Sequence, residues 1–310
     1  MCTITITTKR RRARTWPRWR CALLLSALCT ACAGPAAAFT VVFGSGYQPS
    51  AVLPSTPDVF TAIAAHNPDL VVFAGDVPAA APDAAALDTA YSALAAQPSF
   101  GALRTQAPAY AVYGVHNFAD PTLTNATLTR DTALDLFRAF WDNPAFGLAE
   151  APGCFFSLRE GPVEFFFLDT RYHREVPRDP EQAAVLLGAA QTTWLQDGLR
   201  ASTARYKVLV SAVPFGQRAW QMWGGVYHEA EREALFDFID DQNIGGGFGL
   251  SGGIPRSELW GFRIGWGHRF HEFCTGPLAG PAIARDPERE PDSLEYHHAA
   301  PGVFGEVVFA

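Results

Sequence analysis

The stretch Asn67-Pro-Asp-Leu-Val-Val-Phe-Ala-Gly-Asp76 decides the fold class. Its apolar run, Leu70–Phe73, has no polar interruption, which is typical of a strand buried on both faces in a parallel sheet. The preceding residues, Asp58–Asn67, have helical spacing and stop at an Asn-Pro pair, where helices commonly end. Asp76 therefore follows the carboxyl end of a buried strand that comes directly after a helix.

Strands and helices alternate along the rest of the chain. We predict strands at Phe39–Phe43, Tyr110–Tyr113, Cys154–Arg159, Val163–Leu168, Lys207–Ser211, Gly247–Ser251 and Val303–Phe309, and helices at Pro82–Ala96, Thr132–Trp141, Ala189–Arg200 and Ala230–Asp240. This alternation predicts an α/β layered domain. Asp76, His116 and Asp169 follow three of the strands, at the sheet edge where open α/β sheets bind ligands. A turn or capping role is the structural alternative for each of them.

Residues 1–38 have the composition of a targeting segment. Seven Lys and Arg residues precede the short apolar run Ala22–Ala33, and Ala36 and Ala38 form a small-residue cleavage pattern before Phe39. The apolar run is too short to span a bilayer comfortably. We therefore expect a secreted or exported protein with one domain at residues 39–310. An uncleaved membrane anchor is the alternative.

The charge of the chain limits its partners. The net charge is −7, and removal of residues 1–38, which hold seven basic and no acidic residues, would leave −14. Such an acidic surface argues against nucleic acid or an anionic membrane as a partner. A small phosphate ester stays open as a ligand, and no sequence feature identifies a protein partner.

Two cysteines, Cys154 and Cys274, lie outside the N-terminal segment. In an oxidising compartment they could form a disulfide. Two buried free thiols are the alternative, because the sequence does not show whether the two residues lie close together.

Six segments, in order along the chain, carry a family likeness. They are Asn67–Asp76, Tyr110–Phe118, Leu168–Arg174, Leu187–Leu195, Tyr227–Ile239 and Leu250–Leu259. These segments resemble the alkaline phosphatase D (PhoD-like) family of calcineurin-like metallophosphoesterases, most closely in Leu-Asp-Thr-Arg-Tyr-His-Arg and Leu-Gly-Ala-Ala-Gln-Thr-Thr-Trp-Leu. The resemblance implies a four-layer α/β/β/α sandwich, in which two mixed sheets are flanked by helices.

The resemblance also implies a metal-dependent phosphoric ester hydrolase. Such enzymes use two metal ions (here Fe, Ca or Zn) to clamp phosphate and to generate a hydroxide. On this alignment Asp76 corresponds to the bridging carboxylate and His116 to the catalytic histidine, a general acid or phosphate contact. Asn117, Arg171 and Tyr172 are phosphate-binding candidates, since the arginine fork suits phosphate. A structural salt bridge is the alternative for the last two.

Four of the five expected metal-ligand positions lack a ligand. Gly46 stands where the family has Cys, Val115 where it has a carboxylate, and Gly253 and Pro255 where it has Asp and His. None of these side chains binds a cation. One carboxylate and one imidazole do not recover the cost of dehydrating two ions. We therefore expect no metal, or one weakly bound, and a vestigial role for Asp76 and His116.

Two functional hypotheses follow. The first is a secreted PhoD-like phosphatase-fold protein that is catalytically impaired and retains phosphate-ester binding. The second is an active phosphomonoesterase or phosphodiesterase with rearranged ligands, for which His268, His271 and Glu272 are candidates, although packed or surface histidines are their structural alternative. Three or more metal-binding groups gathered around Asp76 and His116 would favour the second.

Overall fold

The structure is a computed structural model that describes residues 2–7, 38–48, 58–118, 128–175, 184–216, 223, 228–265, 267–285 and 293–310. Of the predicted targeting segment, only residues 2–7 and 38 are among them, and the rest of that segment lies outside the described residues. No helix in the described part of the chain is long and apolar enough to cross a membrane.

The first sheet has five strands in the order β1-β12-β2-β3-β4. Its members are β1 (Cys2–Thr7), β2 (Phe39–Gly44), β3 (Leu70–Ala74), β4 (Ala109–Val112) and β12 (Phe304–Phe309). The strands β2, β3 and β4 run parallel, whereas β12 pairs antiparallel with both β2 and β1. The apolar run Leu70–Phe73 forms the buried strand β3, as predicted.

The second sheet has seven strands in the order β11-β9-β10-β8-β7-β6-β5. Its members are β5 (Phe156–Glu160), β6 (Val163–Leu168), β7 (Tyr206–Ser211), β8 (Gly247–Ser251), β9 (Ser257–Ile264), β10 (His268–Cys274) and β11 (Leu294–His298). The strands β6, β7, β8 and β10 are parallel, and antiparallel strands flank them. Both sheets are therefore mixed.

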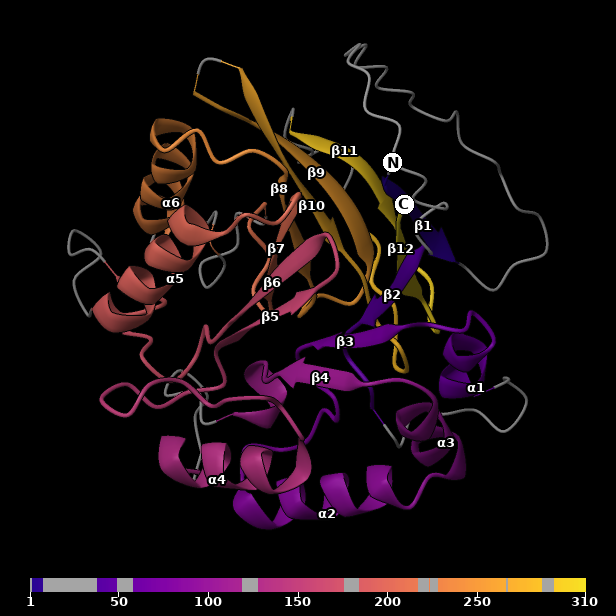
Figure 1. Ribbon diagram of the computed structural model, residues 1–310. Helices are drawn as coiled ribbons and strands as arrows, with labels where there is room; N and C mark the ends of the chain where they lie inside the picture. Colours follow the sequence, from indigo (N-terminus) through magenta and orange to yellow (C-terminus); the bar gives the residue numbers. More distant parts are fainter. Residues whose placement is uncertain are drawn as a thin grey trace.

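Helices cover the outer face of each sheet (Figure 1). They are α1 (Val59–Ala64), α2 (Ala84–Ala95), α3 (Pro98–Gln106) and α4 (Arg130–Phe140) beside the first sheet, and α5 (Ala189–Ala201) and α6 (Glu229–Asp241) beside the second. In β6, Phe165 and Phe167 enter the core shared with the first sheet, and Phe166 and Leu168 enter the core shared with α5 and α6. This alternation gives the predicted four layers.

The structure adds elements that the sequence analysis did not locate, which include α3, β1 and the strands β9, β10 and β11. The helix α3 follows α2 after two residues, Ala96 and Gln97, and begins with Pro98 at its first position, which favours a helix start. The strand β1 lies in the predicted targeting segment and pairs with β12 over six residues. The thiols of Cys154 and Cys274 are both buried and free.

Candidate functional site

Asp76 and His116 lie at neighbouring strand ends of the first sheet. Asp76 is buried and has a left-handed backbone (φ 56°). Its Oδ1 accepts a hydrogen bond from the backbone N–H of His116 at 2.7 Å. Gly114 packs on the same carboxylate, because a Cβ there would lie 2.6 Å from the Asp76 carboxyl carbon. One oxygen of Asp76 thus holds the turn, while the His116 side chain is exposed.

Asn117 completes the short helical turn Val115–Asn117. Its Oδ1 accepts a hydrogen bond from the N–H of Gly114 at 2.7 Å. Its Nδ2 is buried and finds no hydrogen-bond partner within the described part of the chain. A buried amide donor without a partner costs free energy, so a hydrogen-bond acceptor brought to this nitrogen would be stabilising.

Arg171 and Tyr172 are held by the carboxylate of Asp169, which follows β6 and is fully buried. Asp169 Oδ1 accepts the backbone N–H groups of Arg171 and Tyr172, both at 2.8 Å. Asp169 Oδ2 accepts the N–H of Cys154 at 2.9 Å and the hydroxyl of Tyr113. Burial and the charge of Asp169 hold the pKa of Tyr113 well above its usual value, so this phenol stays a donor. Asp169 therefore organises the turn as a structural acceptor.

Aromatic contacts join these two loops. The Tyr113 ring stacks on Phe118, with ring centroids 4.4 Å apart, and the Phe118 ring lies 6.3 Å from that of Tyr172. The loop that carries His116 and Asn117 consequently lies beside the turn that carries Arg171 and Tyr172. The side chain of Tyr172 is itself engaged, because its hydroxyl donates to Asp131.

The four positions that lack ligands lie where backbone segments meet. Gly46 and Gly253 both have left-handed backbones (φ 67° and 73°). The N–H of Gly46 donates to the carbonyl of Gly75 at 3.1 Å. The N–H of Gly253 donates to Ser45 Oγ at 3.2 Å, and the carbonyl of Pro255 accepts the N–H of Ile283 at 2.9 Å. Val115 is half-buried at the start of its turn.

Close backbone packing joins the strand ends of the two sheets. A Cβ on Gly75 would lie 2.7 Å from the Cβ of Ala212, the residue after β7. A Cβ on Gly252, after β8, would lie 2.5 Å from Ser45 Oγ and would overlap the carbonyl oxygen of Ala74. Ser45 also donates to the carbonyl of Thr275 at 2.8 Å. We call Ser45, Gly75, Ala212 and Gly252 the inter-sheet seam. The sequence hints at it only as glycines at strand ends.

The donor set at the seam does not fit a dinuclear metal centre. Asp76 supplies one carboxylate and His116 one imidazole, and the four other expected positions supply no donor side chain. Among the described residues, no group of three or more His, Cys, Asp or Glu side chains is arranged to hold a metal ion. Stable binding of hard or borderline cations needs several such ligands.

The candidate replacement ligands are bound elsewhere. His268 Nδ1 lies 2.8 Å from Asp240, and His271 faces Glu295 at 3.9 Å. The carboxylate of Glu272 accepts the N–H groups of Phe215 and Gly216, both at 2.8 Å. Burial raises the pKa of Glu272 to about 7. These three side chains do not converge into a common metal site.

His228 is a buried residue for which the sequence analysis predicts no role. It precedes α6, is fully buried, and neither ring nitrogen has a hydrogen-bond partner in the described part of the chain. Burial, together with the charges of Arg174 and Arg171, lowers the pKa of His228 to about 4, so the ring is neutral at pH 7. No sequence signal distinguishes this histidine from the exposed ones.

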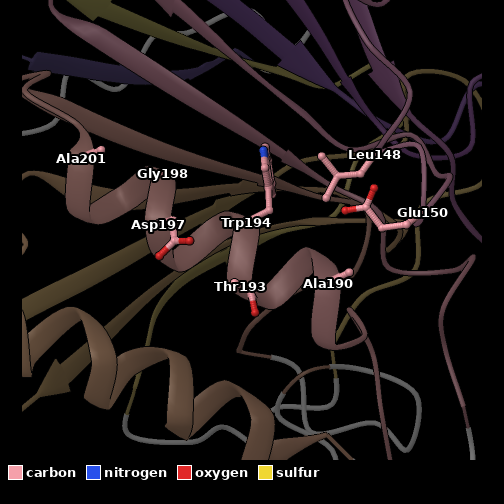
Figure 2. A pocket seen from close by; sticks show the side chains of 8 residues that line it. All are labelled: Leu148, Glu150, Ala190, Thr193, Trp194, Asp197, Gly198 and Ala201. Carbon is pink, nitrogen blue, oxygen red and sulfur yellow. The ribbon is translucent and has the colours of Figure 1, made fainter.

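A surface groove of about 620 Å³ lies apart from these loops, along α5 (Figure 2). Trp194 and Asp197 of α5 contribute to its lining, and Glu150 lies opposite them. None of the predicted site residues lines this groove.

Comparison with known proteins identifies the family. A model of the PhoD-like phosphatase family matches residues 116–301, more than half of the chain. A solved structure of PhoD superposes with a TM-score of 0.70 at 17% identity, over 87% of this chain and 64% of that one. A purple acid phosphatase from yellow lupin seeds gives a TM-score of 0.61 at 12% identity, over 88% of this chain and 49% of that one.

The chain thus spans less than two thirds of the length of either structure. No curated protein sequence matches it. The two superpositions support the metallophosphoesterase fold, and the family model covers the region from His116 to Pro301. The chain therefore belongs to the PhoD-like phosphatase family.

Proposed function

We propose that this protein is a PhoD-like phosphatase-fold protein with impaired metal-dependent catalysis, which retains the ability to bind a phosphate ester. The observation that carries the proposal is the closed inter-sheet seam. Where the resemblance expects metal ligands, the chain has Gly46, Val115, Gly253 and Pro255, and beside them the strand ends of the two sheets approach closely at Gly75 and Gly252.

The energetics of metal binding support the catalytic part of the proposal. Two divalent ions placed a few ångströms apart repel each other, and bridging and terminal anionic ligands must offset both this repulsion and the loss of hydration. Asp76 is one carboxylate, and one of its oxygens already accepts the N–H of His116. We therefore expect no metal, or one weakly bound ion, and little hydrolysis of phosphate esters.

The loop of His116 and Asn117 supports the binding part. The His116 imidazole is exposed, and Asn117 Nδ2 is a buried donor without a partner in the described residues. Both groups can donate hydrogen bonds to phosphate oxygens. Arg171, on the adjacent turn held by Asp169, would add positive charge to the same region. A small phosphate ester is the ligand class that this set of donors favours.

The proposal also includes the cellular location of the protein and the class of its ligand. The basic and then apolar composition of residues 1–38 supports export through the secretory pathway, with membrane anchoring as the alternative. The acidic domain favours a small-molecule ligand over nucleic acid.

Turnover and binding assays test the proposal together. The full chain is supplied with Fe, Zn and Ca, and hydrolysis of p-nitrophenyl phosphate and bis(p-nitrophenyl) phosphate is compared with that of Asp76→Ala. We expect equal rates for the two proteins. Clear turnover that Asp76→Ala abolishes would contradict the proposal and favour an active phosphatase with rearranged ligands.

Phosphate binding is measured by calorimetry with inorganic phosphate and p-nitrophenyl phosphate. We expect Asn117→Ala to weaken binding about tenfold, the effect of losing about 1.4 kcal/mol. His268→Ala is the matched control, because His268 pairs with Asp240 of α6 and belongs to neither the loop of His116 nor the turn of Arg171. Equal affinities for Asn117→Ala and His268→Ala would remove the binding part of the proposal.

A further inference from the structure

The outer edge of β12 differs from the other sheet edges in having no protection within its own sequence. An exposed strand edge offers unpaired backbone groups to other chains, and proteins usually block it with charges, bulges or covering groups. In β12, the six residues Phe304–Phe309 contain no Lys, Arg or Pro and one charged residue, Glu306. The carboxylate of Glu306 contacts His66 Nδ1 at 2.5 Å, so this charge is already engaged.

The three other terminal strands each carry a recognisable protection. The exposed part of β5 ends in the charged pair Arg159 and Glu160. The strand β11 has a bulge between Leu294 and Tyr296. The edge of β4 is covered by Asn143, which donates to the carbonyl of Ala111 at 2.8 Å and accepts its N–H at 3.1 Å. Among these described edges, β12 therefore lacks a bulge, a terminal charged pair and a covering side chain once the N-terminal segment is removed.

The N-terminal strand supplies the missing neighbour. Residues Cys2–Thr7 pair antiparallel with β12 over its whole length, from Cys2 opposite Phe309 to Thr7 opposite Phe304. The sequence Thr3-Ile4-Thr5-Ile6-Thr7 is entirely β-branched, which suits a strand. Figure 1 shows β1 beside β12 on the side of the sheet away from β3 and β4.

We infer that the outer edge of β12 is a strand-acceptor site, which Cys2–Thr7 fills in the uncut chain and which takes the β12 strand of a second copy when the N-terminal segment is removed. Two copies of β12 can pair antiparallel about a two-fold axis, the commonest symmetry of soluble oligomers. A two-fold axis must pass through a pair of identical residues, because opposite pairs of an antiparallel ladder alternate between hydrogen-bonded and non-hydrogen-bonded. An axis at Val307 sets Val307 opposite Val307 of the second copy. It also keeps the two Glu306 carboxylates from facing each other, because each lies opposite Val308.

Removal of the N-terminal segment would therefore couple processing to assembly. The uncut chain is a monomer, because the attached strand competes at high local concentration. After cleavage before Phe39, the strand is free to dissociate and the exposed backbone groups of β12 pair with a second copy. This inference shares with the proposed function the removal of residues 1–38, but it does not depend on phosphate binding or on catalysis, since it concerns the sheet edge and not the strand-end loops.

The experiment uses the full chain with a specific protease site inserted between Ala38 and Phe39. Its mass is measured by light scattering during gel filtration before and after cleavage. We expect a monomer of about 33.6 kDa before cleavage, a dimer afterwards, and a return to monomer on addition of a peptide covering residues 1–8. A monomer after cleavage, or a polydisperse aggregate, would contradict the inference.

Three variants test the pairing in both the uncut and the cut chain. In the uncut chain, Ile4→Pro with Thr5→Pro removes at least one N–H that faces β12, because successive N–H groups of a strand point to opposite sides. This variant should dimerise without cleavage, and a monomer would contradict the inference. In the cut chain, Val308→Glu sets a carboxylate opposite Glu306 of the second copy and should restore the monomer, whereas Ser157→Glu on the edge strand β5 should leave the dimer intact. Equal behaviour of the two glutamate variants would count against pairing through β12.

Discussion

Asp76 and Asp169 occupy equivalent places in the two sheets and have different surroundings. Each follows a buried parallel strand. Asp169 accepts hydrogen bonds from three backbone N–H groups and the hydroxyl of Tyr113, and it is fully buried. The carboxylate of Asp76 accepts one described hydrogen bond, from the N–H of His116, next to a seam that holds no carboxylate, imidazole or thiolate.

The difference shows that the residues that stabilise the family's fold are distinct from the positions expected to bind metal. The segment Leu168–Arg174 resembles the family most closely, and its carboxylate organises a turn without contacting any metal ligand. Gly46, and Gly253 within the family-like segment Leu250–Leu259, stand where the resemblance expects metal ligands, and there the strand ends meet through backbone contacts. A chain can therefore keep the first kind of segment for stability while losing the second.

The largest effect is expected from truncating Asp169. Asp169→Ala leaves several buried donors without an acceptor, and each costs about 1–3 kcal/mol, so the free energy of unfolding should fall by about 4 kcal/mol or more. Asp76→Ala should cost about 1–2 kcal/mol, since fewer donors lose their partner. Urea unfolding of both variants measures the difference. Equal losses would show that the two carboxylates have the same structural role.

A smaller effect is expected from filling the inter-sheet seam. A methyl group at Gly252 would overlap the carbonyl of Ala74, which is backbone and cannot move aside easily. Gly252→Ala should therefore destabilise the fold by about 1–3 kcal/mol. Gly101→Ala is the matched control, because this helical glycine has open space around its Cα. The control should raise the unfolding free energy by about 0.5–1 kcal/mol. A neutral Gly252→Ala would mean that the seam is open.

The pH dependence of stability gives a third prediction. Burial raises the pKa of Glu272 to about 7, above the value of about 4.3 for an unfolded chain. The folded state thus holds this proton more tightly than the unfolded chain does. The contribution of Glu272 to the free energy of unfolding is therefore fully present below about pH 4.3 and is lost as the pH rises through 7. Glu272→Gln removes the titrating group.

The test compares the wild type with Glu272→Gln at pH 5 and pH 8. The difference in the free energy of unfolding, wild type minus Glu272→Gln, should be smaller at pH 8 than at pH 5, by on the order of 2 kcal/mol. His228 is present in both proteins, so its effect on the pH dependence cancels in this difference. Because its pKa is lowered to about 4, His228 destabilises the fold as the pH falls below about 6.5, which is the opposite direction to Glu272. An advantage independent of pH would show that Glu272 is charged throughout this range.

The smallest effect is expected at the surface of the candidate site. Tyr172→Phe removes the hydroxyl that donates to Asp131, an exposed contact worth about 1 kcal/mol or less. Its affinity for phosphate should stay within about twofold of the wild type, because the hydroxyl is already engaged. Calorimetry with inorganic phosphate measures this, and a tenfold loss would assign Tyr172 a direct contact.

Much of the fold could be predicted because its signals are local. The run Leu70–Phe73 and the hairpin ending at Leu168 reveal buried strands through their unbroken hydrophobicity. The helix α3 was missed because its sequence, with Gly101 and polar residues, has weak periodicity. The pairing of β1 with β12 joins the two ends of the chain, and no local pattern reports such a contact.

The candidate site was less predictable because its contacts join segments that are distant in the sequence. The absence of ligand side chains at Gly46 and Gly253 is visible in the sequence. The contacts that replace them are not, because Ser45, Ala212 and Gly252 come from three distant segments. The sequence also does not show that His268, His271 and Glu272 would each find a different partner, since that depends on which face of β10 each residue occupies.

Metal stoichiometry distinguishes a closed seam from a metal centre most directly. The full chain is produced with Fe, Zn and Ca in the medium, and its metal content is measured by plasma mass spectrometry beside that of Asp76→Ala. We expect well below one ion per chain in both proteins, and a melting temperature that a chelator leaves unchanged. About two ions per chain in the wild type, lost in Asp76→Ala together with a lower melting temperature after chelation, would contradict the closed seam.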